Sequence, residues 1–442
     1  MRYLFTFFCL FPAALAQAAP AGAVFPYPYQ QETLPNGLKA IVVPMSSPGL
    51  AAYFTVVRTG SRDEVEAGKS GFAHFFEHMM FRGTKKYPGP VYDSICTGMG
   101  ANANASTTDD FTMFFISFAK DNLEKVIELE SDRFQNLSYL IPAFQTEAGA
   151  VYGEYRKDVT NPFFLLEEKL ADRAYDVHTY KHTTMGFEAD IKAMPEDYDY
   201  SLSFFKRFYR PENVVILVVG DVDAKTVFPL IRKYYGGWKK GYEPAKITPE
   251  PPQTAERRVE ISYPGKTLPI LCMAYKGAAF ETSNPDFAAA RLLSSLAFGE
   301  TSELYKKLVI REQKVEILEA EVPMNRDAAL FTIVAMIKNA EDIDSVQKDI
   351  QDTIKEFQTT PVNQQKLADV KRHDKYEFLD GLDSPERVAE ALVRYIALTG
   401  GIEAVDKLYA QYDRVTPEDI LRAAKAYYQP QRLTIAVLKG EK

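Results

Sequence analysis

The sequence has few cysteines, no excess of basic residues and no uninterrupted apolar run of bilayer length. Three cysteines in 442 residues exclude a small fold held together by a disulfide network. Loss of an N-terminal leader containing Cys9 would leave Cys96 and Cys272, which we expect to be two buried thiols. The 52 basic residues are outnumbered by 60 acidic ones, so no nucleic-acid partner is expected.

The N-terminus has the pattern of a secretory signal peptide. Arg2 precedes the apolar run Tyr3–Ala16, and residues 16–18 form an A-x-A cleavage motif. An uncleaved anchor is the weaker alternative, because the run is shorter than the roughly 20 residues that a bilayer requires and Pro12 interrupts it. We therefore expect a signal peptide at 1–18, no stable membrane anchor, and export to the periplasm if the source is Gram-negative, otherwise secretion.

The pattern of the rest of the chain indicates two related halves. Residues 238–254 contain four prolines and little apolar periodicity, which is typical of a linker, so domains are expected at 25–237 and 255–442. Each half ends with a Pro-Glu-Asp helix start, a Tyr-x-Pro turn and an apolar strand. Each also begins with two strands and a helix: Ala40–Val43, Ala51–Val57 and Gly71–Arg82 in the first, Arg258–Ser262, Pro269–Tyr275 and Pro285–Ala297 in the second.

This repetition predicts an internal duplication of two α+β halves, with helices such as Asn122–Gln135 packed on a mainly antiparallel sheet. The alternative is convergent use of common strand and helix signals. The second half contains no H-x-x-E-H sequence, so we expect a metal site in the first half only.

Residues 74–78 read H-F-F-E-H and lie on a predicted helix, with Ser70 as N-cap and Gly83 as its C-terminal stop. Residues four apart share one helix face, so His74 and His78 can bind a single ion. Glu77 lies beside them. A catalytic zinc usually has three protein ligands and an open position for water, so a third ligand must come from another segment.

The helix predicted from Pro142 to Asn161 supplies two candidates for that third ligand. Glu147 and Glu154 are seven residues apart and therefore lie on one face, two turns apart. Their spacing alone does not choose between them. Core histidines and a solvated acidic helix face are the non-functional alternatives, but with five histidines an H-x-x-E-H arrangement arises by chance in roughly a few of a thousand such compositions.

These motifs resemble the inverzincin metallopeptidases of the pitrilysin and insulinase family, which carry H-x-x-E-H and a distal glutamate. In that family the third ligand follows the second histidine by about 75–80 residues, with another glutamate seven before it. Glu154 lies 76 positions after His78. The resemblance thus implies one Zn²⁺ per chain held by His74, His78 and Glu154, with Glu147 supporting them and Glu77 activating water.

The resemblance covers most of the chain and also implies how substrate binds. Residues Asn104–Phe115 look like the family's N-A-x-T edge strand, which would place extended peptide against Asn104 and Ala105. His178 and His182 resemble a further family segment, but structural polar histidines are the preferred interpretation. The family architecture implies a clam-shell whose two halves enclose a chamber, and at this length the chain resembles short members that pair as dimers.

The second half departs from the family pattern. Many relatives have an arginine and, seven residues later, a tyrosine, which contact substrate beside the zinc. This chain has Arg311, which the resemblance implies binds substrate, but Leu318 in place of the tyrosine. The resemblance therefore implies a heterodimer in which a homologous subunit without the zinc motif supplies the missing group, with a homodimer as the alternative. The expected activity is a zinc endopeptidase for unfolded or short peptides. The rival reading is a non-catalytic scaffold of the same fold, although such relatives typically lose the zinc motif.

Overall fold

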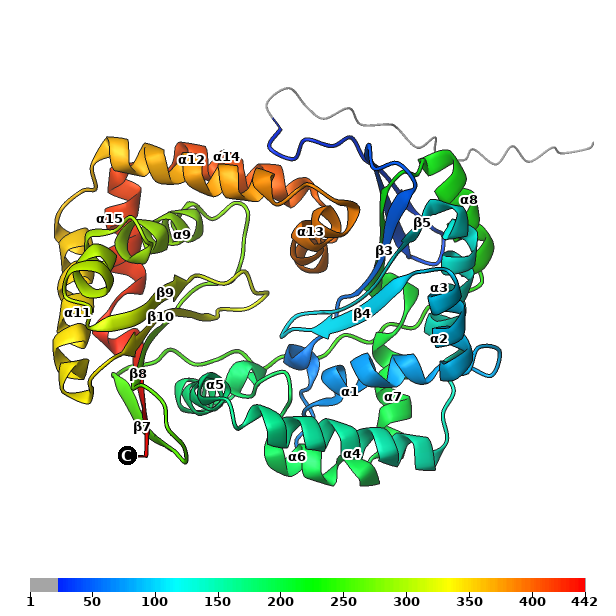
Figure 1. Cartoon of the computed structure of the whole chain (residues 1–442), viewed down its shortest axis with the longest axis horizontal. Helices are drawn as coiled ribbons and strands as arrows, with labels where there is room; N and C mark the ends of the chain where they lie inside the picture. Colours follow the sequence, from blue (N-terminus) through cyan, green and yellow to red (C-terminus); the bar gives the residue numbers. More distant parts are fainter. Residues whose placement is uncertain (1–22, 442) are drawn as a thin grey trace, which may run out of the picture.

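The structure is a computed structural model that describes residues 23–441. It contains two β-sheets with helices on both faces of each (Figure 1). The α+β class and the two facing halves predicted from the sequence are confirmed. The expected signal peptide at 1–18 lies outside the described residues. Among residues 23–441, no helix combines the length and apolar composition needed to cross a bilayer.

Apart from the additional edge strand β1 of the first sheet, the two sheets share one topology, which confirms the internal duplication. Every neighbouring pair is antiparallel except β2–β6 and β7–β11, so in each half the last strand runs parallel to an early one. The first sheet has the order β1 (Gln30–Thr33), β2 (Lys39–Pro44), β6 (Val214–Gly220), β3 (Leu50–Val57), β5 (Thr112–Ala119) and β4 (Asn102–Thr107). The second has the order β7 (Arg257–Tyr263), β11 (Leu433–Gly440), β8 (Ile270–Lys276), β10 (Leu330–Ile337) and β9 (Val315–Glu321).

The predicted helices are present within three residues of their expected bounds. The first half contains α1 (Phe72–Met79), α2 (Gly89–Gly98), α3 (Leu123–Asn136), α4 (Ile141–Asp158), α5 (Pro162–Ala174), α6 (Glu188–Ala193), α7 (Tyr198–Phe208) and α8 (Ala224–Tyr235). The second contains α9 (Pro285–Phe298), α10 (Glu303–Tyr305), α11 (Ile343–Thr359), α12 (Gln364–Asp380), α13 (Pro385–Thr399), α14 (Glu403–Arg414) and α15 (Pro417–Tyr427). The helix expected at Gly71–Arg82 ends as a 3₁₀ turn at Met80–Arg82.

Each half supplies a helix to the sheet of the other. Helix α13 of the second half packs on β3 and β6, and α5 of the first half packs on β7 and β11 (Figure 1). The hydrophobic cluster that contains Leu392 and Ile396 of α13 also contains Phe54 and Leu217 of the first sheet. Leu166 of α5 belongs to a cluster with strands of the second sheet. The halves therefore share core packing and do not form independent bodies.

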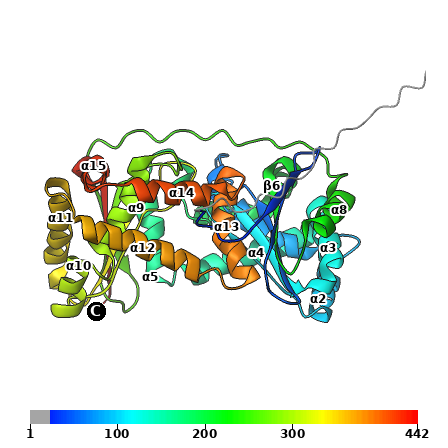
Figure 2. The same cartoon turned by 90° about the horizontal axis from the view of Figure 1, so that it is seen from above.

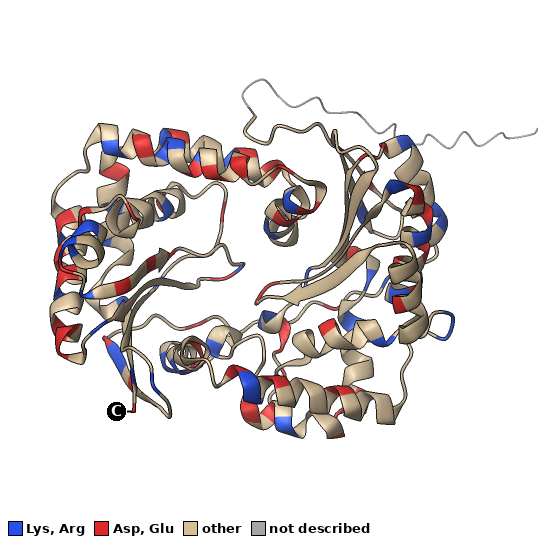
Figure 3. Ribbon diagram, viewed as in Figure 1, with Lys and Arg blue, Asp and Glu red and all other residues tan. Residues whose placement is uncertain are grey.

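The chain between the two sheets is extended and mostly exposed. Residues 238–254 contain no helix or strand and run along one side of the molecule (Figure 2). Because α5 and α13 cross between the halves, domain boundaries placed at this segment remain a prediction. Basic and acidic residues are interspersed on the helices in the view of Figure 3. Cys96 and Cys272 are buried free thiols, as expected.

Candidate metal centre

The buried carboxylate of Glu64, which the sequence analysis did not single out, caps the N-terminus of helix α1. Glu64 Oε1 and Oε2 accept hydrogen bonds from the backbone N–H groups of Ala73 (2.6 Å) and Gly71 (2.7 Å). These are two of the amide groups that an α-helix leaves without internal partners. The prediction that Ser70 is the N-cap is wrong, because the Ser70 hydroxyl donates to Asp190 instead, at 2.7 Å.

The apolar side of α1 fixes which way its polar side faces. Phe72, Phe75, Phe76 and Met79 are fully buried in the core of the first half. This orientation turns the two histidines of the helix towards α4, which contacts α1. Burying aromatic side chains contributes roughly 1.5–3 kcal/mol each, so the direction of the histidines is set by the core rather than by the histidines themselves.

Three side chains converge to form a candidate metal group. Nitrogen atoms of His74 and His78 and an oxygen of Glu154 all lie within 4.8 Å of one another. Glu154 Oε2 is 3.2 Å from His78 Nε2 and 3.8 Å from His74 Nε2. Two imidazoles and one carboxylate are the donor set of a catalytic zinc, which leaves a fourth position for water. The residues present therefore fit Zn²⁺.

Glu147 contacts the back of His78 and is not part of the metal group. His78 Nδ1 lies 3.1 Å from Glu147 Oε1, and the Arg82 guanidinium contacts the other carboxylate oxygen. With its proton assigned to Nδ1, the ring presents the Nε2 lone pair towards Glu154. Burial raises the pKa of Glu147, but the hydrogen bonds from His78 and Arg82 outweigh this effect, so its net pKa is lowered.

His74 is in a state suited to binding a cation. Burial, with a smaller contribution from His78, lowers the pKa of His74 to about 3. The imidazole is therefore neutral near pH 7 and keeps a lone pair for an ion. His74 Nδ1 has no hydrogen-bond partner in the described part of the chain.

Glu77 is not one of the three residues of the metal group. It is hydrogen-bonded to a residue of the edge strand of the first sheet. The Thr107 hydroxyl donates to Glu77 Oε2 at 2.6 Å. Burial raises the pKa of Glu77, with Thr107 and His78 opposing the shift. A carboxylate with a raised pKa beside a metal group is suited to accept and return a proton. The role of Thr107 was not foreseen from the sequence.

The candidate substrate strand is β4, which among residues 23–441 pairs only with β5 and forms one edge of the sheet. Asn104 is exposed on it and Ala105 is buried, and β4 contacts α1. The expected strand Asn104–Phe115 is in fact a hairpin. Its first part is the edge strand, whereas its second part lies inside the sheet as β5.

The structure does not bring the second-half candidates to the metal group. Arg311 is exposed at the end of a π-helical segment, Lys306–Arg311, which contacts α10 and β9. Leu318 is 4% exposed and lies in the hydrophobic core that includes Ala335, its partner on β10. Leu318 thus packs in this core, and the expectation that a substrate-contacting tyrosine is missing at its position stays a prediction.

His178 and His182 are buried polar histidines with structural contacts. His178 Nε2 lies 2.9 Å from Asp327 Oδ2, and its Nδ1 accepts the Tyr180 N–H at 3.0 Å. His182 Nδ1 lies 2.9 Å from the carbonyl oxygen of Thr183. These contacts agree with the structural interpretation of both histidines.

Comparison with known sequences agrees with this geometry. A family model described as "Insulinase (Peptidase family M16)" matches residues 47–188, and one described as "Peptidase M16 inactive domain" matches residues 197–373. The chain belongs to peptidase family M16. It is a zinc protease of this family. The scaffold alternative is therefore set aside. The match to the inactive domain begins at residue 197 in the first half and covers the second half only as far as residue 373.

Relatives from bacteria and mitochondria match almost the whole M16 chain. "Zinc protease PqqE" of Helicobacter pylori is 29% identical over 93% of both chains, and "Mitochondrial-processing peptidase subunit beta" of Blastocladiella emersonii is 24% identical over 96% of this chain and 92% of that protein. The crystal structure of a Helicobacter pylori protease superposes with a TM-score of 0.86 at 28% identity, covering 93% of this chain and 100% of that one. The first half of the periplasmic protease PqqL of Escherichia coli gives 0.76 at 19% identity, covering 97% and 93%.

Proposed function

We propose that this M16 chain is an endopeptidase that binds one Zn²⁺ through His74, His78 and Glu154 and cleaves unfolded or short peptides. The observation that carries the proposal is the convergence of these three donors within 4.8 Å of one another. Glu77, one residue before the second histidine, completes the arrangement. The second half would contribute the chamber and not the metal ligands.

When bound, the ion supplies Lewis-acid polarisation of the scissile carbonyl and acidifies the attacking water. Glu77 takes the proton of that water at the carboxylate oxygen that Thr107 leaves free, and returns it to the leaving amine. Thr107 orients Glu77 through its 2.6 Å hydrogen bond. Glu147 contacts Nδ1 of His78 and so keeps Nε2 directed towards the metal group. A carboxylate commonly has this role next to a metal-binding histidine.

Substrate would bind as an additional strand along β4. The support is that β4 has a neighbouring strand on one side only in the described part of the chain, and that its last residue, Thr107, contacts Glu77. Addition of a strand uses main-chain hydrogen bonds, so it selects extended peptides with little demand on sequence. Asn104 and Ala105 would flank the bound backbone.

The experiment that tests this function is removal and replacement of the metal. We expect the purified protein to carry one zinc per chain, to lose peptide cleavage on dialysis against a chelator, and to regain it when stoichiometric Zn²⁺ is added. Zinc content and cleavage of an unstructured peptide are measured on the same samples. Full cleavage by metal-free protein would contradict the proposal.

We also infer that a homologous subunit without H-x-x-E-H completes the chamber. The side chains that hydrogen-bond to Glu77, His78 and Glu147 in the described part of the chain all come from the first half. Among residues 23–441, no side chain of the second half hydrogen-bonds to these three residues. A relative of similar length is named as the beta subunit of a peptidase, and the chain matches the first half of PqqL.

A partner that adds one donor at a developing oxyanion would raise turnover about 10²–10³-fold. The test is to titrate the purified chain with such a homologue and to follow cleavage and mass together. Full activity of the isolated chain, unchanged on dilution or by the homologue, would refute the shared site. A homodimer by mass with full activity would favour self-pairing.

Export is proposed from the leader pattern at Arg2 and residues 3–18. One solved relative with the same fold is a periplasmic protease by its description. N-terminal sequencing of protein recovered from its host should begin near Ala19, whereas an intact Met1 would contradict export.

A further inference from the structure

We propose that residues 322–329 of the second half, the loop between β9 and β10, position the catalytic machinery of the first half. We call these residues the junction loop. The proposal rests on the function proposed above and assigns the loop a role that requires no contact with the metal group. It gives the half without metal ligands a part in catalysis.

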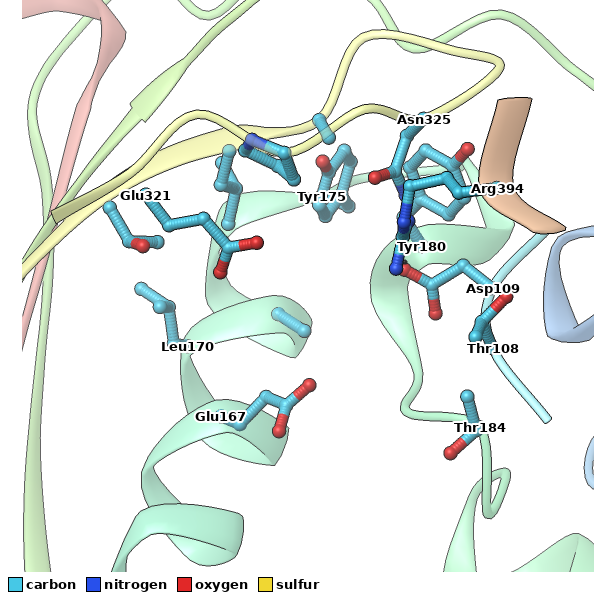
Figure 4. Close-up of a pocket in the computed structure, with 15 residues that line it drawn as sticks. Thr108, Asp109, Glu167, Leu170, Tyr175, Tyr180, Thr184, Glu321, Asn325 and Arg394 are labelled. Atoms are coloured by element: carbon cyan, nitrogen blue, oxygen red, sulfur yellow. Dashed lines mark hydrogen bonds between the residues drawn. The ribbon is translucent and has the colours of Figure 1, made fainter. Parts of the chain in front are cut away.

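The junction loop is hydrogen-bonded to the turn between β4 and β5. Asn325 Nδ2 donates to Asp109 Oδ2 at 3.2 Å, and the Arg326 N–H donates to Asp110 Oδ2 at 3.0 Å. Asn325 and Asp110 are 5% and 1% exposed. Figure 4 shows Asn325 close to Asp109 at one side of a cavity of about 320 Å³ that both halves line. Hydrogen bonds to buried carboxylates are stronger than neutral ones and are poorly replaced by water.

A second contact ties the junction loop to the 3₁₀ turn at Ser61–Asp63. Arg62 Nε donates to Asp327 Oδ2 at 2.6 Å, and His178 Nε2 lies 2.9 Å from the same oxygen. Burial raises the pKa of Asp327, but the bonds from His178 and Arg62 outweigh it and hold the pKa at about 2. The junction loop is thus hydrogen-bonded to two segments of the first half, the 3₁₀ turn and the β4–β5 turn.

Those two segments lie against each other. The Ser61 and Arg62 N–H groups donate to the carbonyl oxygens of Thr108 (3.3 Å) and Asp109 (2.8 Å). A Cβ at Gly60 would lie 2.2 Å from the Thr108 oxygen, so only glycine permits this approach. The 3₁₀ turn and the β4–β5 turn therefore move as one unit under the junction loop.

Two hydrogen-bonded connections link this unit to the catalytic residues. Thr107, adjacent to the β4–β5 turn, holds Glu77 through its hydroxyl. Glu64, adjacent to the 3₁₀ turn, caps the first turn of α1, which carries His74. Displacement of the unit would move the proton acceptor relative to the metal group. A misplacement of about 1 Å at such a site costs about 10²-fold in rate.

The test exchanges the two partners of one junction hydrogen bond in the full-length protein. Asn325→Asp sets two carboxylates against each other and should lower kcat/KM about 10- to 100-fold at saturating zinc. Asp109→Asn should also lower it, whereas the double variant restores the hydrogen bond with donor and acceptor reversed and should recover activity. Asn325→Ala, which adds no charge, is the milder variant. The matched control is Asn339→Asp, because Asn339 donates to Asp342 at 3.4 Å on the surface of the second half, and it should leave kcat/KM unchanged.

Zinc content and amide hydrogen exchange of residues 104–111 are measured on every variant. We expect full zinc, faster exchange in the single variants and wild-type exchange in the double variant. Wild-type kcat/KM and exchange in both single variants, or losses that the double variant does not recover, would overturn the proposal. If the wild-type protein cleaves no peptide at all, the proposed function fails, while exchange still decides whether the junction loop holds the edge strand.

Discussion

Replacement of Glu77 by glutamine should abolish peptide cleavage while leaving zinc in place. Glutamine has the shape of glutamate and can still accept the Thr107 hydrogen bond, so the local structure is retained. It cannot take a proton from water, and loss of a general base typically lowers the rate about 10²–10⁴-fold. Steady-state cleavage of an unstructured peptide and zinc content, measured on the same protein, check this result.

The matched control is Glu124→Gln, because Glu124 is exposed on α3 and pairs with Lys233 at 2.7 Å, away from the metal group. It should retain both zinc and activity. Activity of Glu77→Gln within a few fold of wild type would remove Glu77 from the mechanism. Loss of zinc in Glu77→Gln would instead make it a ligand.

Glu154→Gln and Glu147→Gln should separate the metal ligand from the residue that supports it. Glu154 offers an oxygen to the metal group, so its replacement should leave zinc occupancy well below one ion per chain after dialysis. Glu147 contacts His78 Nδ1, where glutamine can still accept. Glu147→Gln should therefore weaken zinc affinity by about 10–100-fold at most. Zinc competition with a chromophoric chelator measures both affinities.

If Glu147→Gln weakened zinc binding more than Glu154→Gln, the ligand assignment would be reversed. Full zinc binding by Glu154→Gln, together with loss of binding by Glu147→Gln, would make Glu147 the ligand. Equal loss in both variants would indicate that the two carboxylates act as a unit.

Local periodicity predicts the two pairs of residues from which the metal group is drawn. Four residues separate His74 and His78 on one helix, and seven separate Glu147 and Glu154 on another, so a helical repeat places each pair on one face. The strands and the duplication were also predictable, because both halves repeat the same strand and helix signals. The choice of Glu154 over Glu147 came from the family resemblance and not from spacing.

The parts that the sequence could not predict depend on contacts between distant segments. Glu64 lies seven residues before Gly71, outside the positions where a capping side chain is sought. The junction loop meets the β4–β5 turn across 216 residues. The burial of Leu318 could not be predicted either, because the sequence pattern did not reveal the strand that carries it or the face of that strand on which it lies.

The exchange of helices between the halves has a consequence for how the protein is made. The cover of β3 and β6 is α13, Pro385–Thr399, so almost the whole chain must leave the ribosome before that apolar face is buried. Domains of many proteins fold one by one during translation, but here one face of the first sheet stays uncovered until the last quarter of the chain is made. The cluster on its other face is built from buried residues between Leu34 and Trp238. During this interval the exposed apolar face makes the unfinished chain prone to aggregation. A cut within residues 238–254 would likewise leave two fragments that still share one core.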